Sequence, residues 1–243
     1  MQSKTWQVPK IWEGGEVFIL GGGPSIIETF NIPGETVKSV RLQQQGLEAY
    51  SPYFASLYSK HVIGINVAYK LGNWVDICFF GDYPFFLTHR KGLAAFEKLV
   101  VTSCTKVGNK NLEWIKYLPQ ELKKDKPQGQ QTHGISTNPN HVSWNQNSGA
   151  AAISIAAWSG AKRIVLVGFD MNLSPLNNEQ HFHNEYRRFG SKERKDKQLP
   201  FDVHLRTWGV IKSDADNMGI EILNTSLNSA IKEIPKVHIK ELL

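Results

Sequence analysis

Cysteine and long apolar runs are both scarce in this 243-residue chain. Its two cysteines, Cys78 and Cys104, cannot form a disulfide framework, and neither stands in a metal-binding CxxC pair. The longest aliphatic stretches, at 17–20 and 164–167, are far too short to span a bilayer. Residues 1–16 lack the apolar segment of a secretory signal peptide. We therefore expect a soluble, cytoplasmic protein with no stable insertion into membranes.

Signatures of nucleic-acid binding are also absent, because the chain contains no helix-turn-helix, zinc-finger or RNP motif. The formal net charge of +6 and an isoelectric point of about 9.2 fit contact with phosphates, in nucleotides or in polymers. However, basic residues are mixed with acidic ones at 121–126 and 191–197, which is typical of a solvated surface. With 41% hydrophobic and 21% charged residues, the chain has a globular composition.

Short aliphatic runs alternate with helical stretches, which is the pattern of βαβ units and a parallel sheet. The expected strands are 16–20, 61–66, 75–80, 99–103, 163–168 and 219–224. The clearest helical stretches are 46–60, 85–99 and 148–159. The sequence therefore predicts an α/β, Rossmann-like fold, with a mainly parallel sheet and helices on both faces. We expect residues 1–243 to form a single nucleotide-binding domain.

Two polar stretches, 125–147 and 171–200, interrupt this alternation. Long loops in compact domains are usually functional or disordered. The second stretch follows a strand end directly and is basic and histidine-bearing. We expect it to be a lid inserted late in the chain, with simple disorder as the alternative.

A glycine-rich loop follows the first expected strand. Gly21, Gly22 and Gly23 allow the backbone to approach a phosphate, and the following helix start would supply free N–H groups. Pro24 and Ser25 complete the loop, and the serine can cap that helix or donate to a phosphate. The loop is neither GxGxxG nor a P-loop with its lysine, so dinucleotide binding and Walker-type ATP hydrolysis do not follow. A tight turn is the alternative.

Two polar residues, Asn66 and Asp82, come directly after two further expected strands. Because ligands bind beyond the carboxyl ends of parallel strands, both are expected to face the glycine loop. The asparagine can bond a base or a ribose, and the aspartate can accept a ribose hydroxyl or hold Mg²⁺. Each can instead be a polar turn residue.

The entrance to the alanine-rich helix is Asn147, Ser148 and Gly149. We expect Ser148 at the N-cap, which makes an anion-ready helix start. Asp170 ends the most aliphatic strand, where an acid can bind a hydroxyl or a metal, or cap a turn.

Histidines stand out in the expected lid. His181 and His183 lie on the same side of a locally extended segment and can act as base and phosphate partner. They can also be metal ligands, although two histidines are too few for a zinc site. Arg187 and Arg188 are expected to contact phosphate. The remaining candidates lack comparable context and stay unassigned: His89, His133, His141 and His204.

Read in order, these motifs (GGGPS, INVAY, FFGDYPFF, NSG to GFDM, HFH and GIEILNTSLNS) resemble the DUF115 group of hydroxymethylpterin diphosphokinase-like (MptE-like) proteins. The similarity is strongest to the branch found in phage and bacterial genomes and spans residues 16–240. For archaeal members it implies Mg²⁺–ATP chemistry. In that version Asp82 and Asp170 would hold Mg²⁺, while the basic lid would neutralise charge on the phosphate.

The same order also resembles the bacterial lipooligosaccharide sialyltransferases, which use CMP-sialic acid. The resemblance implies that the glycine loop and Asn66 contact the nucleotide and that 147–149 matches a Thr-Ser-Gly helix entrance. It further implies a catalytic base in the lid, at His181 or His183.

Three departures from the sialyltransferase pattern are visible. Gly22 stands where their loop has an asparagine, and Asp82 follows Gly81 where another nucleotide-contacting asparagine is expected. Their lid tyrosines have one candidate match, Tyr186. These departures point away from CMP-sialic acid itself.

Together these features predict a nucleotide-dependent transferase that resembles glycosyltransferases and uses a nucleotide or sugar nucleotide as donor. The alternatives are a Mg²⁺-dependent diphosphokinase, which transfers diphosphate from ATP to a hydroxymethyl acceptor, and a non-catalytic protein that sequesters a nucleotide. The acceptor is left open among a glycan, a small molecule such as a pterin, and modified DNA. The sequence is compatible with an oligomer.

Overall fold

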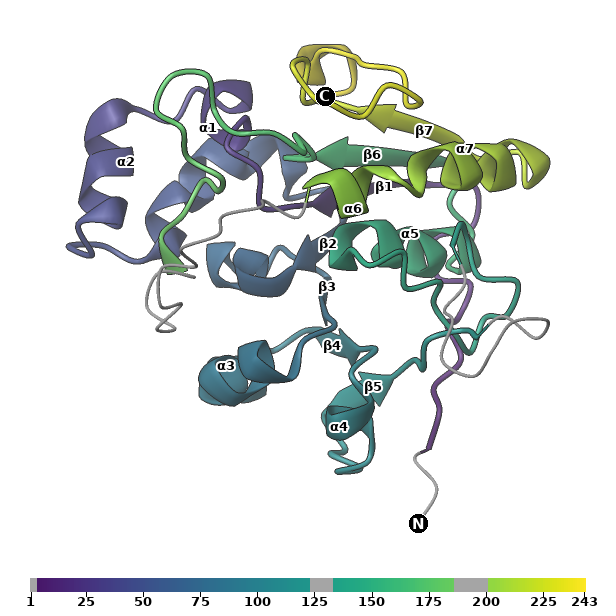
Figure 1. Cartoon of the computed structure of the whole chain (residues 1–243). Helices are drawn as coiled ribbons and strands as arrows, with labels where there is room; N and C mark the ends of the chain where they lie inside the picture. Colours follow the sequence, from purple (N-terminus) through teal and green to yellow (C-terminus); the bar gives the residue numbers. More distant parts are fainter. Residues whose placement is uncertain (1–3, 123–132, 186–200) are drawn as a thin grey trace.

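The computed structural model describes residues 4–122, 133–185 and 201–243. Within these residues, seven strands form one sheet in the order β5-β4-β3-β2-β1-β6-β7 (Figure 1), and every neighbouring pair is parallel. The strands are β1 Glu16–Leu20, β2 His61–Ile65, β3 Ile77–Phe80, β4 Leu99–Thr102, β5 Ile115–Tyr117, β6 Arg163–Val167 and β7 Glu221–Asn224. The predicted Rossmann-like α/β fold is confirmed.

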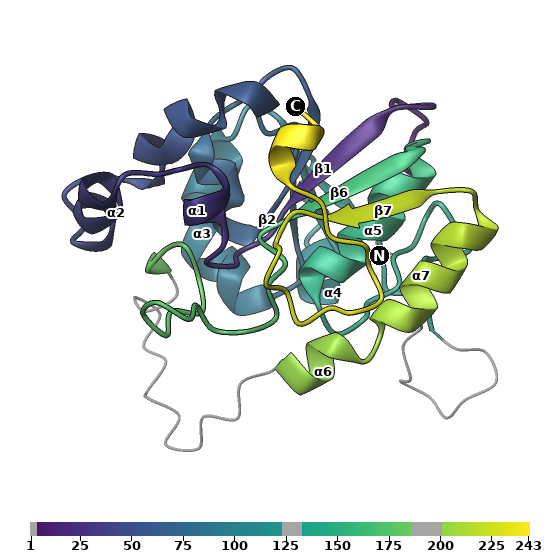
Figure 2. The same cartoon turned by 90° about the horizontal axis from the view of Figure 1, so that it is seen from above.

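Helices cover both faces of the sheet. The α-helices are α1 Ile26–Thr29, α2 Gly34–Arg41, α3 Tyr83–Ala95, α4 Thr105–Gly108, α5 Ser148–Trp158, α6 Phe201–Leu205 and α7 Trp208–Asn217. The 3₁₀ segments include η1 Leu47–Leu57, η2 Asn66–Leu71 and η4 Ile239–Glu241. Seen from above, α1, α2 and α3 lie on one side of the strands, and α5 and α7 lie on the other (Figure 2). None of the helices in the described ranges has both the length and the apolar character of a membrane span.

The side chains on the two faces of the sheet belong to two separate hydrophobic cores. Val17 and Ile19 of β1 belong to the core under α5 and α7, whereas Phe18 and Leu20 belong to the core under α1, α2 and η1. Side chains alternate between the faces of a strand, so a strand covered on both sides must be apolar throughout. This explains the uninterrupted aliphatic runs in the sequence.

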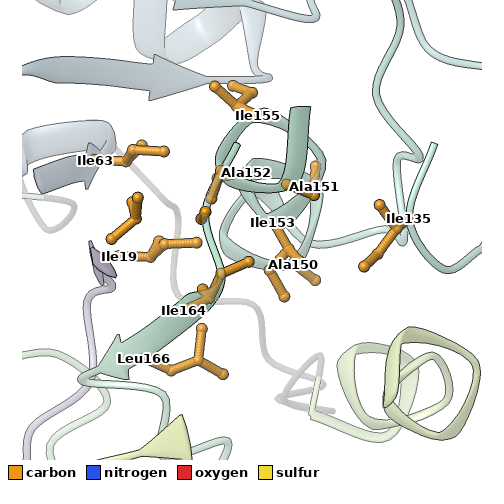
Figure 3. Packing of buried hydrophobic residues seen from close by; sticks show 14 of the residues in the cluster. Ile19, Ile63, Ile135, Ala150, Ala151, Ala152, Ile153, Ile155, Ile164 and Leu166 are labelled. Atoms are coloured by element: carbon orange, nitrogen blue, oxygen red, sulfur yellow. The ribbon is translucent and has the colours of Figure 1, made fainter. Parts of the chain in front are cut away.

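Helix α5 is buried almost all round, which the run of alanines allows. Figure 3 shows α5 residues next to the strand residues Ile19, Ile63, Ile164 and Leu166, with Ile135 on the opposite side of the helix; the labelled α5 residues are Ala150, Ala151, Ala152, Ile153 and Ile155. Small side chains let the helix approach the sheet closely, and a helix that is apolar on every side is one enclosed by protein.

Some expected elements differ in the structure. The stretch predicted as a helix at 46–60 is the 3₁₀ segment η1, which contains Pro52. Proline has no N–H to donate to the preceding turn, so a regular α-helix is disfavoured there. Four helices, α2, α4, α6 and α7, and the three-residue strand β5 were not predicted. A strand of that length carries too few residues for a recognisable alternation.

Strand order creates a crevice at the centre of the sheet. From β1 the chain proceeds outward through β2 to β5 on one side, whereas β6 and β7 lie on the other side. The connections that follow β1 and β6 therefore leave in opposite directions, although the two strands stay paired up to Leu20 and Val167. This switch point is where ligands bind in open parallel α/β sheets.

Candidate functional site

A cavity of about 560 Å³ opens at this switch point, a size in the ordinary range of small-molecule sites. Most residues singled out in the sequence line it, namely Gly21, Gly22, Gly23, Asn66, Asp82, Asn147, Ser148, Gly149, Asp170 and His181. Pro24 and Ser25 instead line a second, smaller cavity of about 210 Å³. Arg187, Arg188 and Tyr186, with the part of the expected lid at 186–200, lie outside the described residues.

Two of the loop glycines are required by contacts within the protein. A β-carbon at Gly21 would lie 2.7 Å from the carbonyl oxygen of Gly168, and one at Gly23 would lie 2.6 Å from the same oxygen. The β-carbon at Gly23 would also overlap the Asp170 carboxylate. These contacts bring the loops after β1 and β6 together at the floor of the cavity. Close approach of a phosphate to the loop stays a prediction.

Asp170 holds the glycine loop in place. Its carboxylate accepts a 3.2 Å hydrogen bond from the Ser25 backbone N–H and a 3.0 Å bond from the Ser25 hydroxyl. The expected side-chain cap from Ser25 to the following helix is absent, because the hydroxyl bonds Asp170 and, at 2.8 Å, the hydroxyl of Ser226. Burial raises the pKa of Asp170 to about 6, and the bonds from Ser25 partly offset this effect.

Residues at the end of β7 and after it hold the loop that follows β6 through hydrogen bonds. Ser226 accepts from the Phe169 backbone N–H at 3.0 Å, and the Phe169 carbonyl accepts from Asn224 at 3.1 Å and from Ser229 at 2.6 Å. All three polar side chains are buried and hydrogen-bonded. Part of the GIEILNTSLNS motif thus positions the cavity floor.

Binding of Mg²⁺ by Asp82 and Asp170 stays a prediction. Both carboxylate oxygens of Asp170 already accept hydrogen bonds from Ser25. Across the described ranges, no group of three or more His, Cys, Asp or Glu is arranged to hold a metal ion. Asp82 precedes α3, makes no side-chain cap there, and lines the cavity. Desolvation by the cavity walls raises the pKa of its carboxyl.

Asn66 adopts a backbone conformation that few residues other than glycine tolerate. Its φ is 53°, in the left-handed region, where asparagine is favoured among side-chain-bearing residues. Its buried Oδ1 finds no hydrogen-bond partner in the part of the chain that the structure describes. A buried acceptor left unsatisfied costs about 1–3 kcal/mol. Backbone strain and an unsatisfied acceptor in a residue of the cavity lining are typical of ligand-binding residues, and contact of Asn66 with a nucleotide stays a prediction.

The N-cap of α5 is Asn147 and not Ser148 as predicted. The Asn147 Oδ1 accepts from the backbone N–H groups of Gly149 at 2.9 Å and Ala150 at 3.2 Å. Ser148 is the first helical residue and lies on the cavity wall. The predicted helix start therefore lies at the cavity with its cap shifted by one residue, and anion binding there stays a prediction.

The two histidines of the expected lid stack, as predicted for a locally extended segment. Their ring centroids are 5.3 Å apart and their planes differ by 6°. His181 lines the cavity, whereas His183 is buried behind it, with its Nδ1 accepting from the Glu185 backbone N–H at 3.2 Å. A β-carbon at Gly22 would lie 3.1 Å from His181 Nδ1, so the middle glycine of the loop makes room for this ring.

The tautomer of His181 follows from its contact with Gly22. His181 Nδ1 lies 3.3 Å from the Gly22 carbonyl oxygen, which can only accept. Nδ1 therefore carries the proton, and Nε2 carries the lone pair. Burial lowers the pKa of His181 to about 4, so the ring is neutral at neutral pH. A neutral imidazole with a defined lone pair is a suitable general base.

The segment that carries the histidines is anchored to the domain. Phe182 is fully buried and packs on Tyr50, with ring centroids 6.1 Å apart. Arg41, at the end of α2, donates to the His181 carbonyl at 3.1 Å and pairs with Glu179 at 2.7 Å. In both views the described part of this segment runs beside α1 and α2 (Figure 1, Figure 2). The described first half of the polar stretch 171–200 is therefore held to the domain by an apolar side chain and by an arginine.

Acid should weaken the folded state through the histidines. Burial lowers the pKa values of His181 and His89 to about 4 from 6.5, and lowers those of His183 and His204. The folded protein then binds fewer protons than the unfolded chain, so the free energy of unfolding falls as the pH drops below 6.5. Asp170 and Asp82, whose carboxyl pKa values are raised by burial, oppose this effect, but they are fewer than the four histidines.

Urea unfolding at about pH 7 and about pH 5 measures this loss. The His181→Gln variant lacks one of the titrating rings and should show a shallower dependence on pH than the parent chain. A pH dependence unchanged in the variant would contradict the role of His181.

Several cavity residues were not foreseen. They are Trp144, Gln146, Met171, Phe201 and His204. Gln146 and Met171 have left-handed φ values of 53° and 51°, a property of the backbone that residue type does not reveal. Trp144 could have been noticed in the sequence, because it is a tryptophan in an otherwise polar loop that leads into the helix entrance.

The fold is shared with known glycosyltransferases at low sequence identity. The MAf glycosyltransferase from Magnetospirillum magneticum AMB-1 matches with a TM-score of 0.56 and 12% identity, over 98% of this chain and 36% of that one. A tyrosine-to-phenylalanine variant of the sialyltransferase CST-II in complex with CMP matches with a TM-score of 0.50 and 12% identity, over 92% of this chain and 86% of that one. CstII from Campylobacter jejuni, in complex with the substrate analogue CMP-3FNeuAc, has a TM-score of 0.49 and 13% identity, over 92% and 86% of the two chains.

No model of a known protein family matches the chain, and no curated protein matches it by sequence. This chain spans about a third of the length of the MAf protein and most of the length of CST-II. Identities of 12% show a common fold. The predicted similarity to the sialyltransferases is confirmed at that level, and membership of the DUF115 group stays a prediction.

Proposed function

We propose that this protein is a glycosyltransferase-like enzyme that uses a nucleotide-activated sugar, with His181 as general base. The observation that carries the proposal is the neutral His181 ring in the wall of the switch-point cavity, beside the Gly21–Gly23 loop. Parallel α/β sheets bind nucleotides at this place, and a neutral imidazole there can act on a substrate hydroxyl.

The nucleotide would lie between the glycine loop and the start of α5. The N-terminus of this 11-residue helix is the positive end of its dipole, which favours a phosphate near Ser148. Asn66 Oδ1 would accept a hydrogen bond from the base or ribose, which would satisfy this acceptor. The structure of CST-II in complex with CMP, which shares the fold, supports cytidine nucleotides as the first ligands to test.

His181 would take the proton of the attacking hydroxyl at Nε2. The hydroxyl oxygen forms the new bond to the anomeric carbon, while the bond from that carbon to the donor phosphate breaks and the nucleotide leaves with the electron pair. Before a substrate binds, a pKa of about 4 makes the His181 ring a weak base. A bound phosphate favours the imidazolium and raises that pKa toward the working range.

Binding of CMP, UDP, GDP and ATP, each with and without Mg²⁺, tests the first half of this proposal. A nucleotide present at 100 times its dissociation constant stabilises the folded state by about 2.7 kcal/mol, which a thermal melt resolves. Asn66→Asp places a negative charge in the cavity with little change of shape and should weaken binding of the nucleotide at least about tenfold. Asn109→Asp adds the same charge at an exposed site outside the cavity and should change nothing.

Hydrolysis of CMP-, UDP- and GDP-sugars, followed as release of the nucleotide, tests the second half. Release that depends on His181 supports a transferase. Tight nucleotide binding without release from any donor would instead favour the non-catalytic alternative. Absence of binding by every nucleotide would overturn the proposal.

A further inference from the structure

Several aromatic residues of the cavity lining have no part in the proposed nucleotide binding or in proton transfer. They are Trp144, from the loop before α5, and Phe85 and Phe201. Asp82 lines the cavity as well, at the start of α3. A flat aromatic surface and a carboxylate thus share one cavity with the proposed nucleotide site.

The position of Trp144 is fixed by Gly81. A β-carbon at Gly81 would overlap Cη2 and Cζ3 of the indole, so the six-membered ring lies directly on the backbone of this glycine. The indole also packs against the core under α5 and remains partly exposed. Asp82 follows Gly81 in the chain, and its side chain and the indole line the same cavity.

The backbone after Trp144 is strained, and the strain is held by a buried side chain. Asn145 and Gln146 both have left-handed φ values, 54° and 53°. The Asn145 amide accepts from the Gly134 N–H at 2.7 Å and donates to the carbonyls of Gly134 at 2.8 Å and Ser143 at 3.1 Å. Consecutive left-handed residues cost of order 1–3 kcal/mol each and persist where the surroundings enforce them, typically at ligand sites.

An indole and a carboxylate that line the same cavity can together bind a sugar ring. The C–H groups of a pyranose pack on an aromatic face, and an ionised carboxylate accepts hydrogen bonds from its hydroxyls. The same carboxylate repels an acidic sugar, because two negative charges a few ångströms apart at a partly desolvated site disfavour each other.

We propose that Trp144 and Asp82 form a subsite for the ring of an uncharged sugar, and that this subsite excludes acidic sugars such as sialic acid. This inference rests on the proposed function and adds to it the class of sugar that the enzyme handles. The ring can belong to the acceptor or to the donor, so free glycosides and nucleotide sugars are tested separately.

Fluorine NMR of the protein labelled with 5-fluorotryptophan reports on this subsite directly. The chain has seven tryptophans, and Trp144→Phe assigns the resonance of interest by its disappearance. Methyl glycosides of glucose, galactose and N-acetylglucosamine, with and without saturating CMP, should shift the Trp144 resonance. N-acetylneuraminic acid should leave it in place. UDP-glucose compared with UDP separates a donor ring from an acceptor ring.

Two variants test the contributions of the indole and of the carboxylate separately. Gly81→Ala displaces the indole and should abolish the sugar-induced shift while the nucleotide still binds. Asp82→Asn removes the charge and should weaken the response to neutral glycosides while admitting sialic acid. A Trp144 resonance that responds to no neutral glycoside, or equally to sialic acid, would overturn the subsite. A shift produced as strongly by CMP alone would show base stacking and overturn it too.

Failure of the proposed function gives a different pattern. If no nucleotide binds but neutral glycosides still shift Trp144, the subsite stands and the transferase proposal falls. If nucleotides bind but no glycoside acts on Trp144, the subsite falls alone.

Discussion

Replacing His181 with glutamine is expected to reduce glycosyl transfer by about 10²–10⁴-fold, the usual contribution of a general base. Glutamine can still donate to the Gly22 carbonyl, which His181 contacts at 3.3 Å, but it cannot accept a proton at neutral pH. The affinity for the nucleotide should be unchanged, because the loss concerns the transition state alone. Initial rates and calorimetry on the same preparations separate the two effects.

His204 is the matched control for this experiment. It also lines the cavity, and burial lowers its pKa, yet the structure gives it no contact with the glycine loop. We expect His204→Gln to retain most of the activity. Activity lost in His204→Gln and kept in His181→Gln would transfer the role of base to His204.

The pH profile provides a second readout. The pH dependence of kcat/KM reports the free enzyme, and that of kcat reports the complex with substrate. With the pKa of free His181 lowered to about 4, the acid limb of kcat/KM should lie near pH 4. A bound phosphate raises this pKa, so the acid limb of kcat should lie at higher pH. Coincident limbs would show that the phosphate does not act on the base.

The sheet could be predicted because each central strand is buried on both faces. Runs such as Phe18–Leu20 and Ile164–Val167 have to be apolar throughout, because their side chains enter both cores in alternation. Strand β5 lies at the edge and has three residues, so it lacks this signal. The 3₁₀ segment η1 has helical spacing of apolar residues, and only the proline within it argues against an α-helix.

The site could be predicted as far as strand ends define it. Parallel strands bring their carboxyl ends to one edge, so residues following β1, β2, β3 and β6 could be grouped without a structure. The hydrogen-bond partners of those residues could not be predicted. The bond between Ser25 and Asp170 joins positions 145 apart, and the cap on α5 depended on which of two adjacent polar residues takes the extended backbone. Trp144 and His204 reach the cavity through loop conformation, which periodicity does not describe.

Phe182→Ala is expected to cost about 3–5 kcal/mol of unfolding free energy, the usual range for removing a buried phenylalanine ring. The side chain is fully buried against Tyr50, and its backbone N–H donates to the Gly22 carbonyl at 3.1 Å. Loss of the ring should also release the adjacent His181, so turnover falls together with stability. Urea unfolding and initial rates measure the two effects.

Leu176→Ala is the matched control, because this leucine lies in the same segment and is 78% exposed. It should change neither stability nor turnover, whereas Phe182→Leu, which keeps most of the apolar volume, should fall between the two alanine variants. If Phe182→Ala unfolded no more readily than Leu176→Ala, the histidine segment would be uncoupled from the core. The position of His181 would then have to be set by Arg41, whose guanidinium bonds the His181 carbonyl, and Arg41→Gln would become the substitution that releases the base.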